Sequence, residues 1–219
     1  MSPVERSTES NKVVLCDFDG TLTPFIVIDH LYKTFAQCGL EFAERWERGE
    51  ISTMEEMEST FATVTASREE MESELAKLEL VPGASNFISF CQERGYSFAI
   101  VSDGLQWYIE YILQQHGITD IKIIASQIYF KTNGFHFSYP WYNPEVPLRS
   151  TSKPTIIRHY QERGSRVAFI GDGTSDFEVV GVADSIYARR KLAEYCQSKG
   201  VPAIAFTDFF DLIAKWQEF

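Results

Sequence analysis

Two aspartates stand two positions apart directly behind a short apolar run. Asp17 and Asp19 follow "VVLC", residues 13–16, and precede Gly20. Because side chains alternate along an extended chain, both carboxylates can project to one side while Phe18 points to the other. Two like charges this close are costly without a cation or a shared proton. The pair therefore indicates a divalent metal site or separate acid and base roles, with simple turn chemistry as the alternative.

A second acidic segment repeats this arrangement. In "RVAFIGDGTSDFE", residues 166–178, an apolar run leads into Asp172 between two glycines, and Asp176 follows where a helix is expected to begin. Glycines there let the backbone approach a ligand closely. The alternative is structural, since a carboxylate in the first turn of a helix also interacts favourably with the helix dipole.

Two more polar positions end apolar runs or begin helices. Ser102 in "FAIVSDG" is followed by Asp103 and Gly104, and its hydroxyl with the next backbone N–H groups at a helix start can hold an anion. Lys153 in "STSKPTII" stands before Pro154 at the start of another expected helix and can supply a compact positive charge. The plain alternatives are a helix cap for Ser102 and a solvated surface lysine.

The elements that must position these residues alternate along the chain. Apolar runs typical of strands cover residues 12–18, 96–102, 121–126, 166–173, 185–188 and 202–206. Helical patterns cover residues 83–95, 105–117 and 153–164. This order predicts an α/β fold, a Rossmann-like and mostly parallel sheet with helices on both faces. Ligands bind at the carboxyl ends of such strands, where the acidic motifs and Ser102 fall.

One interval breaks the alternation. Residues 24–81 contain two capping-box patterns, Ser52 with Glu55 and Ser67 with Glu70, and predict a small inserted α-helical cap. The catalytic core is then expected over residues 12–23 and 82–219, with residues 1–11 as a disordered tail. A hairpin is predicted around Asn133-Gly134, which makes the sheet mixed or adds a flap.

Composition narrows the class of protein. The 219 residues carry a formal net charge of −11, which opposes binding to nucleic acid. No apolar run approaches the roughly 18 residues of a membrane span, and the first ten residues lack the apolar stretch of a signal peptide. The four cysteines include no C-x-x-C pair. We therefore expect a soluble cytoplasmic protein without membrane or nucleic-acid partners; the sequence does not determine its oligomeric state.

In this order, "DFDGT", "VSDG", "SKP" and "GDGTSDFE" resemble the four motifs of the haloacid dehalogenase superfamily of phosphotransferases. The helical insertion resembles the small cap of its subclass IB, the branch that contains phosphoserine phosphatase. The stretch "SDGLQWYIEYIL", the aromatic hairpin and the ending "FTDFFDLI" are similar to methionine-salvage phosphatases that act on a methylthio-pentenyl phosphate, and to phosphoethanolamine and phosphocholine phosphatases.

The resemblance implies a Mg²⁺-dependent phosphomonoester hydrolase with an aspartyl-phosphate intermediate. Asp17 is the expected nucleophile, and Asp19 the acid that protonates the leaving group and later the base that activates water. Magnesium is expected on Asp17, Asp172 and the backbone carbonyl of Asp19. The residues expected to bind or neutralise the phosphate are Ser102, Asp103, Gly104 and Lys153, with Asp176 orienting Lys153 or a metal-bound water.

The substrate itself is less constrained. Ile26 stands where phosphoserine phosphatases carry a glutamate, which disfavours phosphoserine as the alternative substrate. Ile26 and Met57 of the cap, and Arg149 with Tyr139 and Trp141 of the loop 138–152, are expected near a small phosphate ester, although they can equally belong to local packing. A phosphotransferase to an alcohol acceptor and a non-catalytic binding protein are the remaining alternatives.

Overall fold

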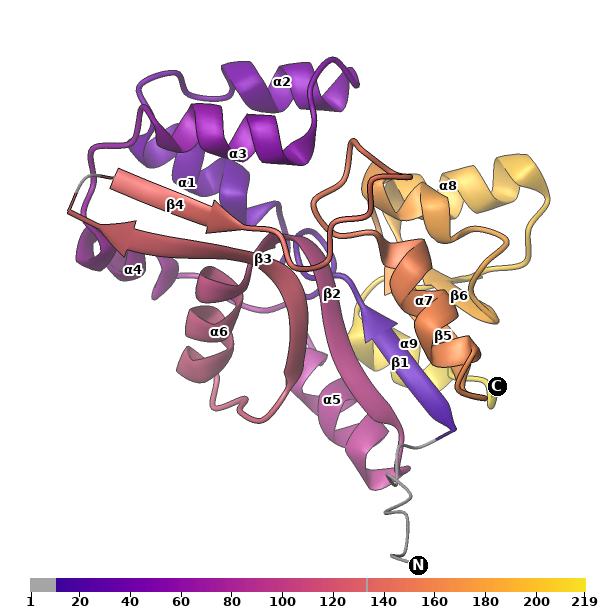
Figure 1. Ribbon diagram of the computed structural model, residues 1–219. Coiled ribbons are helices and arrows are strands. Elements are labelled where there is room, and N and C mark those ends of the chain that lie inside the picture. Colours follow the sequence, from indigo (N-terminus) through magenta and orange to yellow (C-terminus); the bar gives the residue numbers. More distant parts are fainter. Residues whose placement is uncertain (1–10, 133) are drawn as a thin grey trace, which may run out of the picture.

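A seven-stranded sheet forms the centre of the protein. The computed structural model describes residues 11–132 and 134–219, so the predicted tail up to residue 10 and Asn133 of the predicted turn lie outside the described residues. The strands are β1 (Lys12–Cys16), β2 (Ser97–Leu105), β3 (Lys122–Lys131), β4 (Gly134–Ser138), β5 (Arg166–Gly171), β6 (Ser185–Ala188) and β7 (Ile204–Ala205). Their order is β4-β3-β2-β1-β5-β6-β7, and every neighbouring pair is parallel except β3 with β4 (Figure 1). The predicted mostly parallel α/β fold is confirmed.

Helices cover both faces of this sheet. They are α5 (Ala84–Glu93), α6 (Gln106–Gln115), α7 (Lys153–Gln161), α8 (Arg190–Lys199) and α9 (Phe209–Lys215), with the 3₁₀ helix η1 (Thr174–Val179) after β5. The period-two alternation of β1 sets the two cores: Val13 and Leu15 pack with α7 and α8, whereas Val14 and Cys16 pack with α5, α6 and α9. Within the described ranges, every helix is too short or too polar to cross a bilayer.

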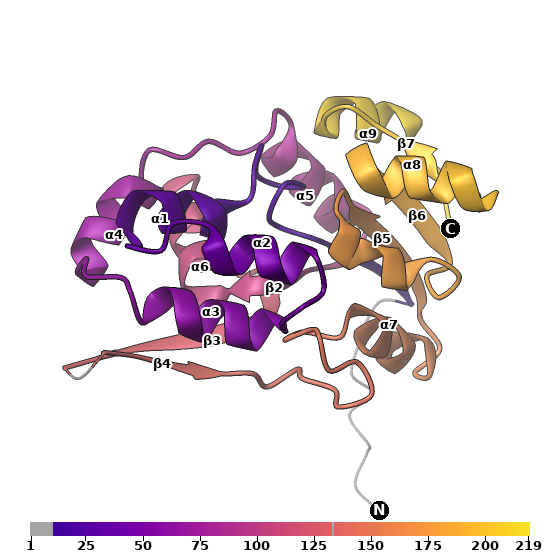
Figure 2. The same ribbon diagram turned by 90° about the horizontal axis from the view of Figure 1, so that it is seen from above.

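Four helices are inserted between β1 and α5 and lie together near the carboxyl ends of the strands (Figures 1 and 2). They are α1 (Val27–Phe35), α2 (Glu41–Glu47), α3 (Thr53–Phe61) and α4 (Arg68–Leu75). Both predicted capping boxes are present: the Ser52 and Ser67 hydroxyls accept the N–H groups of Glu55 and Glu70 at 3.2 Å. These bonds satisfy donors that a helix start otherwise leaves unpaired. We call α1–α4 the cap; its predicted boundaries, residues 24–81, stay a prediction.

The β3–β4 hairpin packs against the cap beside α3 (Figure 2). Phe135 and Phe137 of β4 pack on Phe61 of α3 with ring centroids 5.1 and 5.4 Å away. In the loop after β4, the carbonyl of Leu148 accepts hydrogen bonds at 3.0 Å from both the backbone N–H and the hydroxyl of Thr53. These contacts hold the cap against the core on this side, near the carboxyl ends of the strands.

Candidate active site

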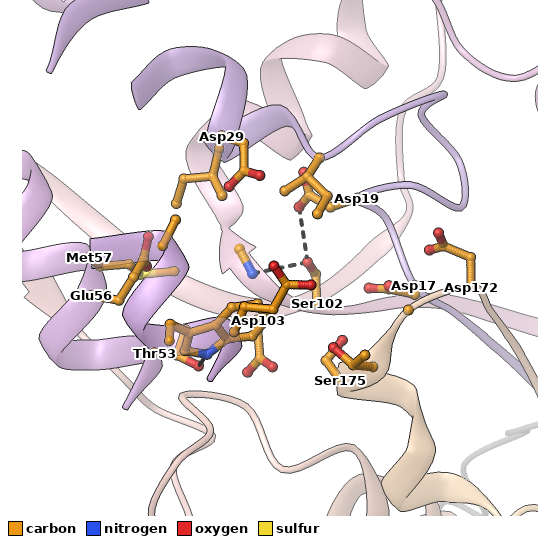
Figure 3. A pocket seen from close by; sticks show the side chains of 18 of the residues that line it. Asp17, Asp19, Asp29, Thr53, Glu56, Met57, Ser102, Asp103, Asp172 and Ser175 are labelled. Atoms are coloured by element: carbon orange, nitrogen blue, oxygen red, sulfur yellow. Dashed lines mark hydrogen bonds between the residues drawn. The ribbon is translucent and has the colours of Figure 1, made fainter. Parts of the chain in front are cut away.

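The acidic motifs meet because their strands are neighbours. Asp17 directly follows β1, and its N–H donates to the carbonyl of Ile170 in β5 at 2.9 Å. Asp172 directly follows β5, and Ser102 lies in β2 on the other side of β1. The parallel register therefore brings all three side chains to one edge of the sheet, as Figure 3 shows.

A buried cluster of carboxylates surrounds one lysine. One oxygen each of Asp17, Asp172 and Asp176 lies within 4.8 Å of the others. Nζ of Lys153 is 3.1 Å from Asp17 Oδ1 and 2.5 Å from Asp176 Oδ1, and the lysine is 2% exposed. Burial alone would lower the pKa of Lys153, but Asp17 and Asp176 raise it above its ordinary value. The lysine is therefore held charged inside the site.

Asp176 acts as the anchor of this cluster. Its Oδ2 accepts the backbone N–H groups of Asp172 at 2.9 Å and Gly173 at 3.0 Å, while its Oδ1 faces Lys153. Gly171 is required beside it, since a Cβ there would lie 2.5 Å from Asp176 Oδ2. The expected helix start at Asp176 is a 3₁₀ helix that begins at Thr174. All these contacts fit an orienting role.

Asp17 and Asp172 have the chemistry of a site for a hard divalent cation. They are 4% and 7% exposed, and burial raises the pKa of both carboxyls above the ordinary value. Lys153 offsets one of the three negative charges of the cluster, and Arg190, which donates to Asp172 Oδ2 at 3.2 Å, sits at its partly exposed rim. Carboxylate oxygens in this number are the ligands that Mg²⁺ prefers. The residues present thus fit a magnesium ion.

The surroundings of Asp19 differ from those of Asp17. Its Oδ1 accepts the N–H of Val27 at 2.6 Å, and its Oδ2 accepts the hydroxyl of Tyr108 and, at 3.5 Å, that of Ser102. No lysine or arginine of the described chain pairs with it. Burial raises the pKa of Asp19 to about 6, although the bonds from Tyr108 and Val27 lower it. Such a group can give and take a proton near neutral pH.

The segment from Ser102 to Gly104 differs from the sequence expectation. Strand β2 continues through Leu105 with a register shift after Val101, and α6 begins only at Gln106, so these amides are not at a helix start. The Ser102 hydroxyl lies beside Asp19 and accepts the N–H of Gly104 at 3.0 Å. The Asp103 carboxylate turns to the segment before Lys153, where its Oδ1 accepts the Ser150 hydroxyl at 3.2 Å and the Thr151 N–H at 3.0 Å.

A cavity of about 310 Å³ connects these residues with the cap. Ile26 and Met57 line it, and Figure 3 shows Met57 across the cavity from Asp17. That these two residues contact the substrate stays a prediction. Arg149 is not brought to this cavity: it pairs with Glu178 at 2.9 Å and lies over the ring of Trp46. Tyr139 and Trp141 were expected near the substrate together with Arg149. The Tyr139 hydroxyl donates to Glu58, and Trp141 is 39% exposed. The cavity is lined instead by the core motifs and cap helices α1, α2 and α3.

The sequence of residues 14–180 matches the model of one family, described as haloacid dehalogenase-like hydrolase. The chain belongs to this family. The prediction of a haloacid dehalogenase-like phosphatase from the four motifs is therefore confirmed, and the matched residues include all four of them. The carboxylate cluster of Asp17, Asp172 and Asp176 lies within the residues that match this hydrolase family.

Relatives and solved structures extend the comparison. Two proteins named 2-hydroxy-3-keto-5-methylthiopentenyl-1-phosphate phosphatase are similar: that of an Exiguobacterium species is 28% identical, covering 92% of this chain and 95% of the relative. That of Microcystis aeruginosa is 29% identical over 92% and 96%. A structure titled as a phospho-aspartyl intermediate analogue of phosphoserine phosphatase superposes with a TM-score of 0.70 at 19% identity, covering 94% of this chain and 99% of that one. This structural likeness shows that the haloacid dehalogenase-like fold is shared.

Four residues of this hydrolase site were not found from its sequence. Tyr108 bonds to Asp19, and the Thr21 hydroxyl donates to Asp172 Oδ1 at 2.9 Å. Arg190, with a φ of 44°, donates to Asp172 and to the carbonyls of Gly20 and Pro24. Glu56 lines the cavity from α3. The threonine of "DGT" was the one usable signal, since it directly follows the acidic motif; the others depend on tertiary placement.

Proposed function

We propose that the protein is a Mg²⁺-dependent hydrolase of a small alkyl phosphate, with a phosphorylated Asp17 as intermediate. The observation that carries this proposal is the pairing of two unlike aspartates in one site. Asp17 lies in the carboxylate cluster beside Lys153, whereas Asp19 lies outside it with a pKa of about 6. One aspartate is thereby suited to attack phosphorus and the other to move protons.

In the first step an Asp17 oxygen forms a bond to phosphorus while the bond to the ester oxygen breaks. The proton of Asp19 goes to the departing oxygen, which an alkoxide needs because it is a poor leaving group. Lys153, fixed between Asp17 and Asp176, offsets the charge of the transferring group. The Ser102 hydroxyl, which lies 3.5 Å from Asp19 Oδ2, would donate to a phosphoryl oxygen.

In the second step Asp19, now a carboxylate, takes a proton from water that attacks the phosphorylated Asp17. The acyl phosphate breaks, and inorganic phosphate and the Asp17 carboxylate are released. Magnesium, held by Asp17, Asp172 and the backbone carbonyl of Asp19, would screen the phosphoryl oxygens and so lower the barrier to attack by an anion. Asp176 and Thr21 hold Lys153 and Asp172 in position for both steps.

The named relatives make a methylthiopentenyl phosphate one candidate substrate. Transfer of the phosphoryl group to an alcohol shares the first step with hydrolysis. The two reactions are distinguished by the product, which is a new phosphate ester in one case and inorganic phosphate in the other. The test is release of phosphate from an aryl phosphate and from short alkyl phosphates, with magnesium, with a chelator, and with added alcohol acceptors. Release that stops in chelator and returns with magnesium is expected. Full activity in chelator, or no activity under any condition, would overturn the proposal.

A further inference from the structure

The cap side of the cavity is rich in carboxylates that the proposed chemistry does not use. Besides apolar side chains from Ile26, Ile28 and Met57, this wall carries acids from all three contributing cap helices. They are Asp29, Glu44, Glu47 and Glu56. Glu47 pairs with Lys191 at 2.8 Å and Glu44 is exposed, so Asp29 and Glu56 are the two that need an explanation.

Glu56 is 5% exposed and faces the cavity from α3. Its Oε2 accepts the hydroxyl of Tyr32 at 3.3 Å, and within residues 11–132 and 134–219 no donor reaches its Oε1. Burial, with smaller contributions from Asp29 and Asp103, raises the pKa of Glu56 to about 8, although the hydrogen bond from Tyr32 lowers it. Glu56 thus presents its Oε1 to the cavity, where a donor group of a ligand can reach it.

Asp29 approaches from the first turn of α1, on another wall of the cavity (Figure 3). Its carboxylate accepts no hydrogen bond from the part of the chain that the structure describes. Burial raises its pKa, with Lys33 opposing and Glu47 adding to the rise. The carboxyl groups of Asp29 and Glu56 thus face the space where the alcohol portion of a substrate lies when its phosphate is at Asp17.

The chemistry of that alcohol portion follows from these acceptors. A purely apolar group would remove water from Asp29 and Glu56 without replacing its hydrogen bonds, which is costly for buried polar groups. Hydroxyl or ammonium groups would instead donate to them, which stabilises the ionised form of Glu56 over the protonated form that burial favours. The carbon chain of the ligand would pack on Ile28 and Met57. Sites built to bond a substrate donor reject analogues that lack it far more strongly than apolar pockets reject a missing methylene.

We propose that Asp29 and Glu56 are specificity residues that select phosphate esters whose alcohol portion carries O–H or N–H donors. Polyol phosphates and aminoalkyl phosphates share this chemistry, as does the 2-hydroxy-3-keto-5-methylthiopentenyl phosphate in the relatives' names, which carries a hydroxyl group. Simple n-alkyl and methylthioalkyl phosphates lack such donors. The inference rests on the proposed function, because it places the phosphate at Asp17.

The experiment compares kcat/KM for four esters of matched chain length: a polyol phosphate, an aminoalkyl phosphate, an n-alkyl phosphate and a methylthioalkyl phosphate. At least one donor-bearing ester is expected to exceed both apolar ones by tenfold or more. Glu56→Gln and Asp29→Asn are each expected to reduce that ratio about ten- to hundredfold, mainly through KM. A larger loss in Glu56→Gln for the amine than for the polyol would identify an ammonium ligand, and similar losses would identify hydroxyls.

Glu58→Gln is the matched control, because Glu58 is on the same helix but bonds to Tyr139 outside this cavity. It should leave the ratio unchanged, and thermal unfolding of all three variants checks that they fold. Equal or better turnover of the apolar esters, or ratios unaffected in both variants, would overturn the inference while leaving the proposed function intact. An absence of magnesium-dependent hydrolysis of any ester would instead refute the proposed function.

Discussion

The hydroxyl of Tyr108 donates a hydrogen bond to Oδ2 of Asp19, which lies 89 positions earlier in the chain. This bond favours the ionised carboxylate and so lowers the pKa of Asp19 against the effect of burial. In Tyr108→Phe the pKa of Asp19 should therefore rise, and the acid form should persist to higher pH.

For this variant we expect turnover of an alkyl phosphate to fall about tenfold or more, because Asp19 loses the bond that orients it. The alkaline limb of kcat/KM should move to higher pH. A full pH profile with an alkyl phosphate measures both effects. An unchanged profile would mean that Tyr108 only fills space.

Gly104 has room for no side chain. A Cβ at this position would lie 1.7 Å from the Tyr108 hydroxyl oxygen and 2.8 Å from Asp19 Oδ2. Gly104→Ala should therefore displace both groups and reduce turnover about a hundredfold, while the circular dichroism of the variant stays native. Gly173→Ala is the comparison, since its nearest neighbour would be Ser175 Oγ at 3.9 Å. Similar losses in both variants would contradict the steric explanation.

The anchoring bonds of Asp176 make a prediction about magnesium. Asp176→Asn removes the negative charge that pairs with Lys153. It also weakens the acceptor for the backbone N–H groups of Asp172 and Gly173. We expect the magnesium concentration for half-maximal activity to rise about ten- to hundredfold, as is typical for residues that orient metal ligands. Titration of magnesium in a phosphate-release assay measures this shift. A fall in kcat with an unchanged magnesium requirement would assign Asp176 to Lys153 alone.

Glu56 links stability to pH. Its pKa is about 8 in the folded protein and about 4.5 when exposed, so the folded state holds the proton between these values and the unfolded state does not. Stability from this group is therefore present below pH 4.5 and is lost as pH rises toward 8, by up to roughly 5 kcal/mol. Thermal unfolding of Glu56→Gln at pH 5 and pH 9, without substrate, should show the variant gaining on the wild type at pH 9. A constant difference would contradict the raised pKa.

Much of this arrangement follows from local sequence. Asp17, Asp172 and Ser102 could be predicted at one edge because each follows or ends an apolar run, and parallel strands present such ends together. The capping boxes at Ser52 and Ser67 were predictable because they involve neighbours along the chain.

Other features depend on packing that no local pattern encodes. The register shift in β2 moves the start of α6 beyond Ser102, and Tyr108 reaches Asp19 only across that irregular turn. Arg190 donates to Asp172 while its own backbone has a positive φ, a conformation that few residues other than glycine adopt. Arg149 lies in a loop and pairs with Glu178. Its positive charge alone therefore did not predict whether it faces the cavity.

In the proposed reaction Asp17 carries the phosphoryl group and Asp19 carries the proton. Asp17→Asn removes the nucleophile, so no phosphoenzyme should form with any ester. Asp19→Asn keeps the nucleophile but removes the proton donor, so alkyl phosphates should lose about 10²- to 10⁴-fold. A nitrophenolate leaves without a proton, so phosphorylation of Asp17 by an aryl phosphate should be less affected, while hydrolysis of the phosphoenzyme slows for want of a base.

Rapid-quench measurement of protein-bound phosphate from a labelled aryl phosphate tests this division most directly. Labelled protein should accumulate in Asp19→Asn and be absent in Asp17→Asn. Labelling that survives in Asp17→Asn, or equal loss of aryl and alkyl activity in both variants with no labelled protein, would contradict the assignment of the two aspartates.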